Sequence, residues 1–263
     1  RQIAQQPAEP RDSCKLLVLN KETGTLEDSY FYKLIDFLKE GDTLVFNNSK
    51  VFPARLKFQW NDKPAEILLL KDKNEGKWQV LGTPGKMLRI GQKIEIKEGV
   101  DATVLEDYQD GTRLLQFNVQ GQEFNDFING FGVLPLPPYI DSFKGNDSLY
   151  QTIYSKISGS VAAPTAGLHF TKSLLAKLNA KGINTEFVTL HVGLGTFLPV
   201  KTKNILEHKM HEEEYEIDFA TAHRLNKVKK NGQRIIAVGT TAVRVLESNF
   251  DTRKGFVAEK KST

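Results

Sequence analysis

The sequence predicts an α/β protein in which a layered α/β/α domain carries an inserted small six-stranded β-barrel domain. Between about Arg55 and Phe117, six short segments of alternating polarity follow one another without a convincing helix, which is typical of a small barrel or curled sheet. On both sides of this region strands and helices alternate, as in a layered domain. We therefore place a discontinuous α/β catalytic domain at residues 1–55 and 122–263, and the barrel at 56–121.

The first third should fold as strand, turn, helix and strand. An apolar strand is expected at 16–19 and a turn at 21–24. Apolar residues recur at helical spacing over 31–38, and a buried strand should follow at 43–46. The six barrel strands are then expected at LKFQW, AEILLL, KWQVLG, KIEIKE, ATVLED and RLLQFN, with a short helical turn at 124–128 leaving the region.

The last third should consist of helices with clear first and last residues. Thr171 is the expected N-cap of a helix that Gly182 ends, and a strand follows at 185–192. Asp218 should cap a second helix, which Gly232 ends. The next strand, RIIAVG, opens through Thr240 and Thr241 into the helix AVRVLES.

Composition limits the class of protein. The chain has 263 residues, 40% of them apolar, and no run of roughly 18 uncharged apolar residues that a membrane span needs. Cys14 is the single cysteine, which excludes an intramolecular disulfide and argues against a thiolate metal cluster. We expect it to be a small apolar residue entering a strand. The net charge of +4 permits binding to a polyanion without demanding it.

The segment SVAAPTAGLHF at 160–170 places small residues and a proline directly before a helix. Such a segment brings backbone N–H groups close to a ligand. Pro164, Thr165 and Gly167 would then bind it, and His169 could transfer a proton. The alternative is a packed turn with a structural histidine.

The segment TLHVGLGTF at 189–197 ends a strand with His191 and continues into a glycine-bracketed loop. Ligands gather at the carboxyl ends of parallel strands, so Gly193, Gly195 and Thr196 are candidate ligand contacts. The loop is not a full dinucleotide fingerprint, because a third glycine and a following helix are missing.

Two further groups of polar residues follow buried strands. Thr240 and Thr241 stand at the start of a helix, and Arg244 lies one turn further, able to reach a carboxylate or phosphate. An ordinary helix cap with a surface arginine is the alternative. Asn47, Asn48 and Arg55 could bind ribose, phosphate or a carboxylate, or could form a polar turn.

The run HKMHEEE invites a metal interpretation, because His208 and His211 are three residues apart. It lacks helical apolar periodicity and a third evident ligand, so we predict no catalytic metal. We expect instead a solvated charge run in which His211, Glu212 or Glu214 performs acid–base chemistry.

Eight blocks occur in one order along the chain: PRDS at 10–13, GDTLVFNNSKVFPARL at 41–56, LPLPPYI at 134–140, YQTIY at 150–154, SVAAPTAGLHFT at 160–171, TLHVGLGTFLPV at 189–200, HKMHEEEYEI at 208–217 and IAVGTTAVRVLES at 236–248. Together they closely resemble the S-adenosylmethionine:tRNA ribosyltransferase-isomerase family of queuosine biosynthesis.

The resemblance implies a cytoplasmic enzyme, expected to be a monomer without membrane contact, prosthetic group or metal. Its tRNA partner would have a GUN anticodon carrying 7-aminomethyl-7-deazaguanine at the wobble position. S-adenosylmethionine would be the co-substrate. Its ribosyl part would move to the aminomethyl group and rearrange to an epoxycyclopentanediol, giving epoxyqueuosine and releasing adenine and methionine.

The same resemblance implies which residues serve the reaction. The sulfonium acidifies the C5′ hydrogens, so that a base could remove one, the ribose ring open and adenine depart. The expected acid–base groups are His169, His191, His211, Glu212 and Glu214. The residues expected to bind S-adenosylmethionine are Asn47, Asn48, Arg55, Pro164, Thr165, Gly167, Gly193, Gly195, Thr196, Thr240, Thr241 and Arg244.

Some features depart from the family pattern. Cys14 and Lys15 replace a small polar residue and an arginine, and Lys50 stands where arginine is common. We expect the chain to lack the family's usual N-terminal segment and its final TNFHLP-like block. Two alternatives stay open: a paralogue that uses another S-adenosylmethionine or tRNA substrate, and a non-catalytic RNA-binding protein. The small-residue loops argue against the second, because an RNA clamp needs charge and stacking surfaces instead.

Overall fold

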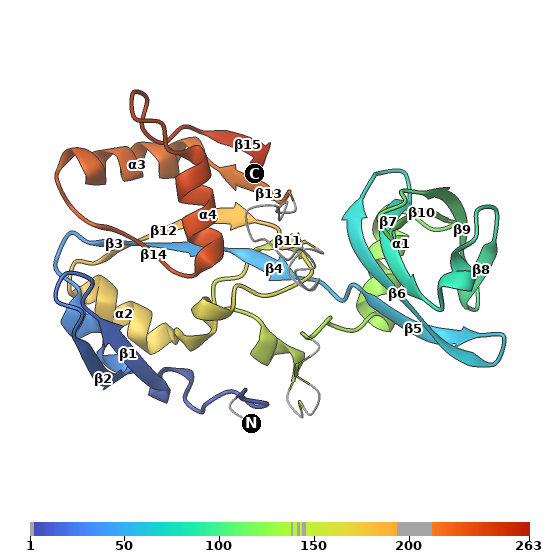
Figure 1. Ribbon diagram of the computed structural model, residues 1–263, viewed down its shortest axis with the longest axis horizontal. Helices are drawn as coiled ribbons and strands as arrows, with labels where there is room; N and C mark the ends of the chain where they lie inside the picture. Colours follow the sequence, from blue (N-terminus) through green and yellow to red (C-terminus); the bar gives the residue numbers. More distant parts are fainter. Residues whose placement is uncertain (1–2, 138, 141–142, 144–145, 194–211) are drawn as a thin grey trace.

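The computed structural model describes residues 3–137, 139–140, 143, 146–193 and 212–263. Figure 1 shows two bodies, a layered α/β body and a six-stranded barrel, which are joined by extended segments. The predicted fold class is confirmed.

The α/β body is built on a five-stranded mixed sheet. Its strands, in spatial order, are β14 (Ile235–Ala237), β3 (Thr43–Asn47), β12 (Asn184–Leu190), β13 (Glu214–Ile217) and β15 (Glu259–Ser262). β14 and β12 both run parallel to β3, whereas β13 is antiparallel to β12 and to β15. The carboxyl ends of β14, β3 and β12 therefore lie at one edge of the sheet, which we call the carboxyl edge.

Alternation along β3 produces the three layers. Leu44 and Phe46 pack on one face with α2 (Lys172–Ala180), and Val45 packs on the other with α3 (Phe219–Lys230) and α4 (Thr240–Asn249). All five residues of β3 are buried, as predicted. Fully burying a side chain such as Phe46 contributes about 2–3 kcal/mol, so this strand anchors both layers.

The two predicted N-caps are confirmed. The Thr171 side chain accepts a hydrogen bond from the backbone N–H of Leu174, and Asp218 accepts one from Thr221. Each bond satisfies an N–H group that has no partner within its helix. Gly182 and Gly232 follow the two helices with φ of 77° and 66°, conformations that glycine adopts without strain.

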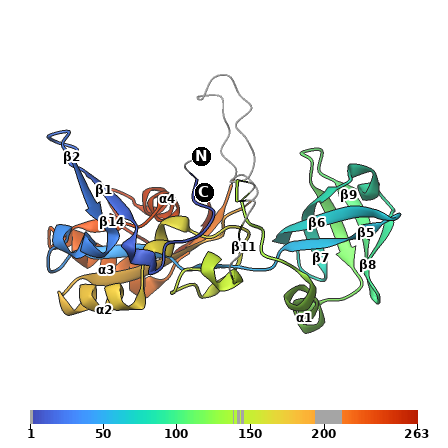
Figure 2. The ribbon, with the colours of Figure 1, turned by 90° about the horizontal axis from the view of Figure 1, so that it is seen from below.

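The N-terminal elements differ from expectation in detail. β1 (Lys15–Leu19) pairs with β2 (Leu26–Tyr30) in a hairpin that projects from the α/β body (Figure 2), and Leu17 and Leu19 are exposed. The expected helix at 31–38 is a 3₁₀ helix, η2 (Phe31–Phe37). It is short and has no side-chain cap, which favours the tighter winding.

Two short strands carry the chain out of the α/β body and back. β4 (Ser49–Val51) pairs in parallel with β11 (Ile157–Ser160). Short 3₁₀ helices, η1 (Arg11–Ser13), η4 (Asp147–Tyr150) and η5 (Thr165–His169), connect the remaining segments of this body. The pairing of β4 with β11 brings the chain that leaves β3 beside the segment that leads into η5.

All six predicted barrel strands are present in one antiparallel sheet. In spatial order they are β5 (Arg55–Trp60), β6 (Lys63–Asp72), β7 (Lys77–Thr83), β10 (Arg113–Phe117), β9 (Val100–Asp107) and β8 (Lys93–Lys97). β5 and β8 lie against each other, so the sheet nearly closes. The short 3₁₀ helix η3 (Gly85–Leu88) lies between β7 and β8 along the chain.

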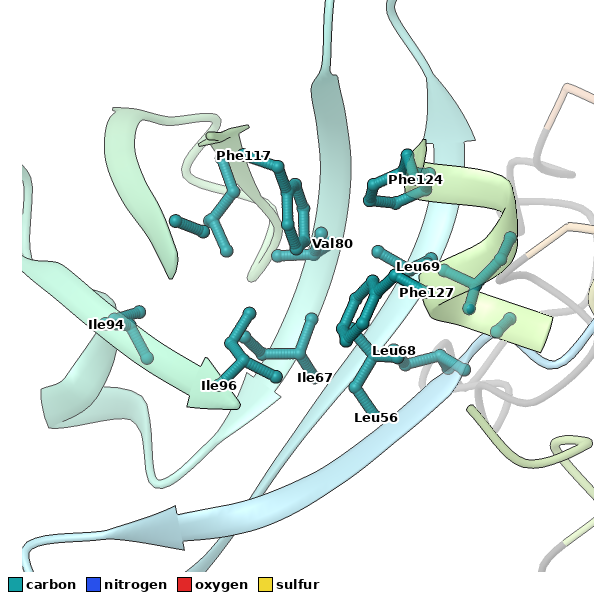
Figure 3. Packing of buried hydrophobic residues seen from close by; sticks show 14 of the residues in the cluster. Leu56, Ile67, Leu68, Leu69, Val80, Ile94, Ile96, Phe117, Phe124 and Phe127 are labelled. Carbon is teal, nitrogen blue, oxygen red and sulfur yellow. The ribbon is translucent and has the colours of Figure 1, made fainter. Parts of the chain in front are cut away.

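The barrel core includes a helix. Phe124 and Phe127 of α1 (Gly121–Phe131) point toward the strand side chains in Figure 3 and belong to the same buried cluster. The helical turn expected at 124–128 is thus a longer helix that packs on the barrel. The domain limits given above stay a prediction. None of the helices in the described part of the chain is long and apolar enough to cross a membrane.

Candidate active site

Three of the predicted site segments meet at the carboxyl edge. The backbone N–H of Val161 donates to the carbonyl of Val192 at 3.1 Å, and the Ser160 hydroxyl accepts from the N–H of Val192 at 3.0 Å. A Cβ atom placed on Gly239 would lie 3.1 Å from the Cβ of Ala166. The SVAAPTAGLHF segment therefore lies between the end of β12 and the start of α4.

His191 directly follows β12 and precedes Val192, which bonds to the SVAAPTAGLHF segment. A Cβ on Gly159 would lie 2.9 Å from the imidazole Cε1 and 3.0 Å from Nδ1, so the ring packs directly on the glycine backbone. Nδ1 is buried and has no hydrogen-bond partner among the described residues. Burial lowers the pKa of His191, against the opposing effect of the Glu214 carboxylate. A neutral imidazole with an unused nitrogen is suited to accept a proton.

His169 lies in different surroundings. Its Nδ1 is 3.1 Å from the Cys14 sulfur, and its ring centroid is 5.2 Å from that of Phe31. Burial lowers its pKa as well. Cys14 is thus a contact of His169, in addition to leading into β1. The described contacts of His169 and His191 share no residue.

His169 lines a cavity of about 560 Å³, a size typical of small-molecule sites. The walls are mostly apolar and include Leu136, Leu149 and Leu168. The Arg11 guanidinium at its rim is held by backbone carbonyls, with an N–O distance of 2.8 Å to Gln151. The cavity can therefore take a largely apolar group with His169 beside it.

Glu213 joins two of the predicted residues. Its Oε1 accepts a hydrogen bond from the N–H of Gly193 at 3.0 Å, and its Oε2 pairs with Arg244 Nη1 at 2.6 Å. Arg244 thus reaches a carboxylate, as the sequence suggested, and that carboxylate belongs to the protein. Glu213 was not predicted, although its alternation with the buried Tyr215 and Ile217 pointed to an inward-facing residue.

The start of α4 retains unsatisfied polar groups. Its N-cap is Gly239, with φ of 87° and no side-chain capping bond. The Thr241 hydroxyl is buried without a partner among the described residues, and Thr240 is exposed. A helix N-terminus with free donors favours an anionic ligand group such as a carboxylate.

Several predicted ligand contacts have partners within the protein. The buried Asn47 amide pairs with both backbone groups of Leu190, and Asn48 Oδ1 accepts from the Thr189 hydroxyl at 2.8 Å. These bonds are what a polar turn holding β12 would require. Arg55 forms an ion pair with Glu66 in the barrel at 3.3 Å.

Gly167 has a packing role, since a Cβ there would lie 1.9 Å from the Tyr154 hydroxyl. Pro164 is buried, while Thr165 is exposed and lines the cavity beside His169. The packed-turn alternative therefore describes the middle of this segment.

The acidic run is divided by the limits of the described chain. Glu212 is exposed, whereas Glu214 begins β13 and forms an ion pair with Lys71 at 2.5 Å. No group of three residues that could hold a metal occurs in the described part of the chain. Gly195, Thr196 and His211 lie outside the described residues.

The chain is similar to known proteins of one family. A family model described as "Queuosine biosynthesis protein" matches residues 1–263. The S-adenosylmethionine:tRNA ribosyltransferase-isomerase of Fusobacterium nucleatum is 47% identical over 265 residues, covering 99% of this chain and 75% of that protein. A crystal structure of S-adenosylmethionine tRNA ribosyltransferase from Thermotoga maritima is 33% identical with a TM-score of 0.43, covering 99% of this chain and 71% of that one.

Proposed function

The chain belongs to the queuosine biosynthesis protein family of S-adenosylmethionine:tRNA ribosyltransferase-isomerases, and we propose that it forms epoxyqueuosine in tRNA. The family and enzyme class expected from the sequence are thereby confirmed. In the proposed reaction, the ribosyl part of S-adenosylmethionine moves to 7-aminomethyl-7-deazaguanine at the wobble position of a GUN anticodon. Adenine and methionine are released, and no prosthetic group or metal takes part.

One observation supports a binding site for S-adenosylmethionine at the carboxyl edge. The half-buried His191 ring, whose Nδ1 has no partner among the described residues, packs on Gly159 directly before the segment 160–170, which contacts both Val192 and Gly239. Ligands of layered α/β domains bind outside the carboxyl ends of the strands. We therefore place S-adenosylmethionine at the carboxyl edge, between the α/β body and the barrel.

In this proposal His191 is the base that removes a C5′ proton. The sulfonium next to C5′ stabilises the resulting carbanion, which allows the ribose ring to open and adenine to leave. The base must be neutral before the step, and the lowered pKa of His191 keeps it neutral at pH 7. The aminomethyl group of the tRNA base then attacks the opened sugar.

His169 is the second proton-transfer group. It lines an apolar cavity of about 560 Å³, which is large enough for a nucleobase. Adenine leaves more readily when it is protonated, so a histidine at the wall of such a cavity can assist its departure. His211, Glu212 and Glu214 stay candidates for the remaining proton transfers.

The start of α4 is proposed to bind the methionine carboxylate. Thr240, Thr241 and the first N–H groups of the helix supply donors, and the helix N-terminus favours negative charge. Arg244 and Glu213 act together: their ion pair holds the Gly193 loop beside this helix. We propose that Gly193, Gly195 and Thr196 complete the contacts with the nucleoside.

The tRNA would contact basic residues that surround the site, among them the exposed Lys50. Binding to phosphates releases counterions, so affinity for precursor tRNA should fall steeply between low and high salt. We expect the enzyme to act in the cytoplasm as a monomer.

The experiment measures adenine and methionine release in three reactions: S-adenosylmethionine alone, with precursor tRNA, and with the same tRNA carrying guanine at the wobble position. The proposal expects one equivalent of each product only with precursor tRNA. Release without that tRNA would point to a paralogue with another substrate. Tight tRNA binding without release would point to an RNA-binding protein.

A further inference from the structure

An ion pair joins the barrel to the five-stranded sheet next to the candidate site. Lys71 Nζ on β6 lies 2.5 Å from Glu214 Oε1, the first residue of β13. Between described residues it is the one ion pair that joins the barrel to the five-stranded sheet. Both side chains are nearly half exposed, at 46% and 42%, so water screens the attraction and the pair adds little to stability. The ion pair matters because it joins β6 of the barrel to the first residue of β13, next to His191.

A local irregularity of β6 presents Lys71 to Glu214. The pairing of β6 with β7 shifts register between Leu69 and Lys71. Leu69 is fully buried in the barrel core, whereas Lys71 is exposed. Such bulges redirect a side chain and are frequent next to active sites.

Glu214 is the acidic group with the strongest influence on His191. The backbone N–H of His191 donates a hydrogen bond to the backbone carbonyl of Glu214 at 2.9 Å, which continues the antiparallel pairing of β12 with β13. The Glu214 carboxylate raises the pKa of His191. Lys260 on β15 lowers this pKa, and Glu216 on β13 raises it by less than Glu214 does. Lys71 pairs with the Glu214 carboxylate and lowers its pKa.

The Glu214 carboxylate therefore interacts with Lys71 and with the His191 side chain, and Lys260 acts on both Glu214 and His191. While Lys71 occupies Glu214, the carboxylate attracts a proton on His191 less strongly, and the imidazole stays neutral. If the barrel moved away, Glu214 would be free to stabilise a protonated imidazole. Such linkage is reciprocal, so protonation of His191 must in turn weaken the Lys71 contact.

We propose that Lys71 is a positioning residue for the reaction, which couples the placement of the barrel over the carboxyl edge to the readiness of His191 to accept a proton. The inference rests on the proposed function of His191. It gives the barrel a part in the chemistry, because the base is ready only when both bodies are in place. Lys71 itself touches no reacting atom.

The test is an NMR titration of the His191 imidazole in the intact chain without substrates, with its resonance assigned from its loss in His191→Asn. Lys71→Gln should raise the pKa of His191 by about half a unit, because Glu214 loses its other partner. Glu214→Gln should lower it. In the Glu214→Gln background, Lys71→Gln should change nothing further.

Lys73→Gln is the matched control. It removes the same charge from the same exposed end of the barrel, two residues beyond Lys71, and should leave the titration unchanged. An unmoved His191 pKa in Lys71→Gln would overturn the inference, as would a shift that persists in the Glu214→Gln background.

Adenine release as a function of pH supplies a separate measurement. The acid limb of turnover should move to higher pH in Lys71→Gln and to lower pH in Glu214→Gln, following the NMR values. If the wild-type chain released no adenine, the proposed function would fail while the titration still decided the role of Lys71. If turnover were normal and its acid limb did not follow the imidazole, the coupling would be refuted.

Discussion

Gly159 provides the sharpest test of whether the position of His191 matters. This residue has φ of 139°, a conformation that side chains rarely adopt, and it lies under the imidazole ring. Gly159→Ala would introduce a methyl group 2.9 Å from the ring Cε1 and 3.3 Å from Nε2. The substitution changes no charge and removes no hydrogen bond, so its effect is confined to backbone strain and the ring position.

The geometry around Gly159 determines how much stability and turnover the substitution should cost. Adopting this backbone conformation with a Cβ costs about 1–3 kcal/mol, which corresponds to a Tm lowered by roughly 2–12 °C in a chain of this size. The ring must also retreat from 2.9 Å to at least the 3.4 Å of ordinary contact. A misplacement approaching 1 Å can reduce turnover by about 100-fold. Turnover should therefore fall far more than the remaining stability explains.

The assay combines thermal unfolding with adenine release at 25 °C, where the variant should stay folded. Gly130→Ala is the control, because Gly130 lies in α1 with open space around the position of a new Cβ. It should be neutral or stabilising by about 0.5 kcal/mol, with normal turnover. Normal turnover in Gly159→Ala, or a loss that merely follows unfolding, would refute a role for the ring position.

Three further results are expected. Glu213→Gln should destabilise the fold by about 2 kcal/mol and reduce adenine release roughly tenfold, since the ion pair between Glu213 and Arg244 is lost; Glu247→Gln, at an exposed position of α4, should do neither. Burial holds the pKa of both His191 and His169 below the ordinary 6.5; because the proposed base His191 stays neutral, turnover should persist to below that pH and then fall. Unfolding measured over the same range should show stability lost on acidification, because the unfolded chain takes up those protons first. His169→Gln should keep its melting temperature and slow adenine release about 100-fold; loss of both together would make it a structural residue.

Local features of the fold were predictable from the sequence. Thr171 and Asp218 act as N-caps because the capping bond spans only three residues, which a short stretch of sequence reveals. The barrel strands were predictable because each alternates over its own length. The winding of η2 was not, since the same apolar spacing fits an α-helix and a 3₁₀ helix.

Remote pairings were not predictable. β4 contacts β11 across about a hundred residues, and neither strand is long enough to show an alternating pattern. The strands β13 and β15 were missed for the same reason, and with them the inward direction of Glu213. Gly159 had no signal of its own, because its role depends on the ring of a residue 32 positions later.

The sequence predicted the proximity of some candidate residues. His191, Gly193 and Arg244 do lie together at the carboxyl edge, because strand ends and helix starts are visible in the sequence. Asn47 and Gly167 looked the same in sequence as ligand contacts, yet their partners are backbone groups and a tyrosine. The sequence alone does not show whether such a residue contacts a ligand or packs within the protein; the packing in the folded structure does.

The most direct test of the central claim is adenine release from S-adenosylmethionine by His191→Asn in the presence of precursor tRNA, with thermal unfolding measured on the same sample. Asparagine keeps a polar group in place of the imidazole Nδ1 but cannot take up the C5′ proton. We predict an unchanged melting temperature with turnover slowed by about 100-fold or more. Turnover close to that of the wild type would contradict the assignment of His191 as the base.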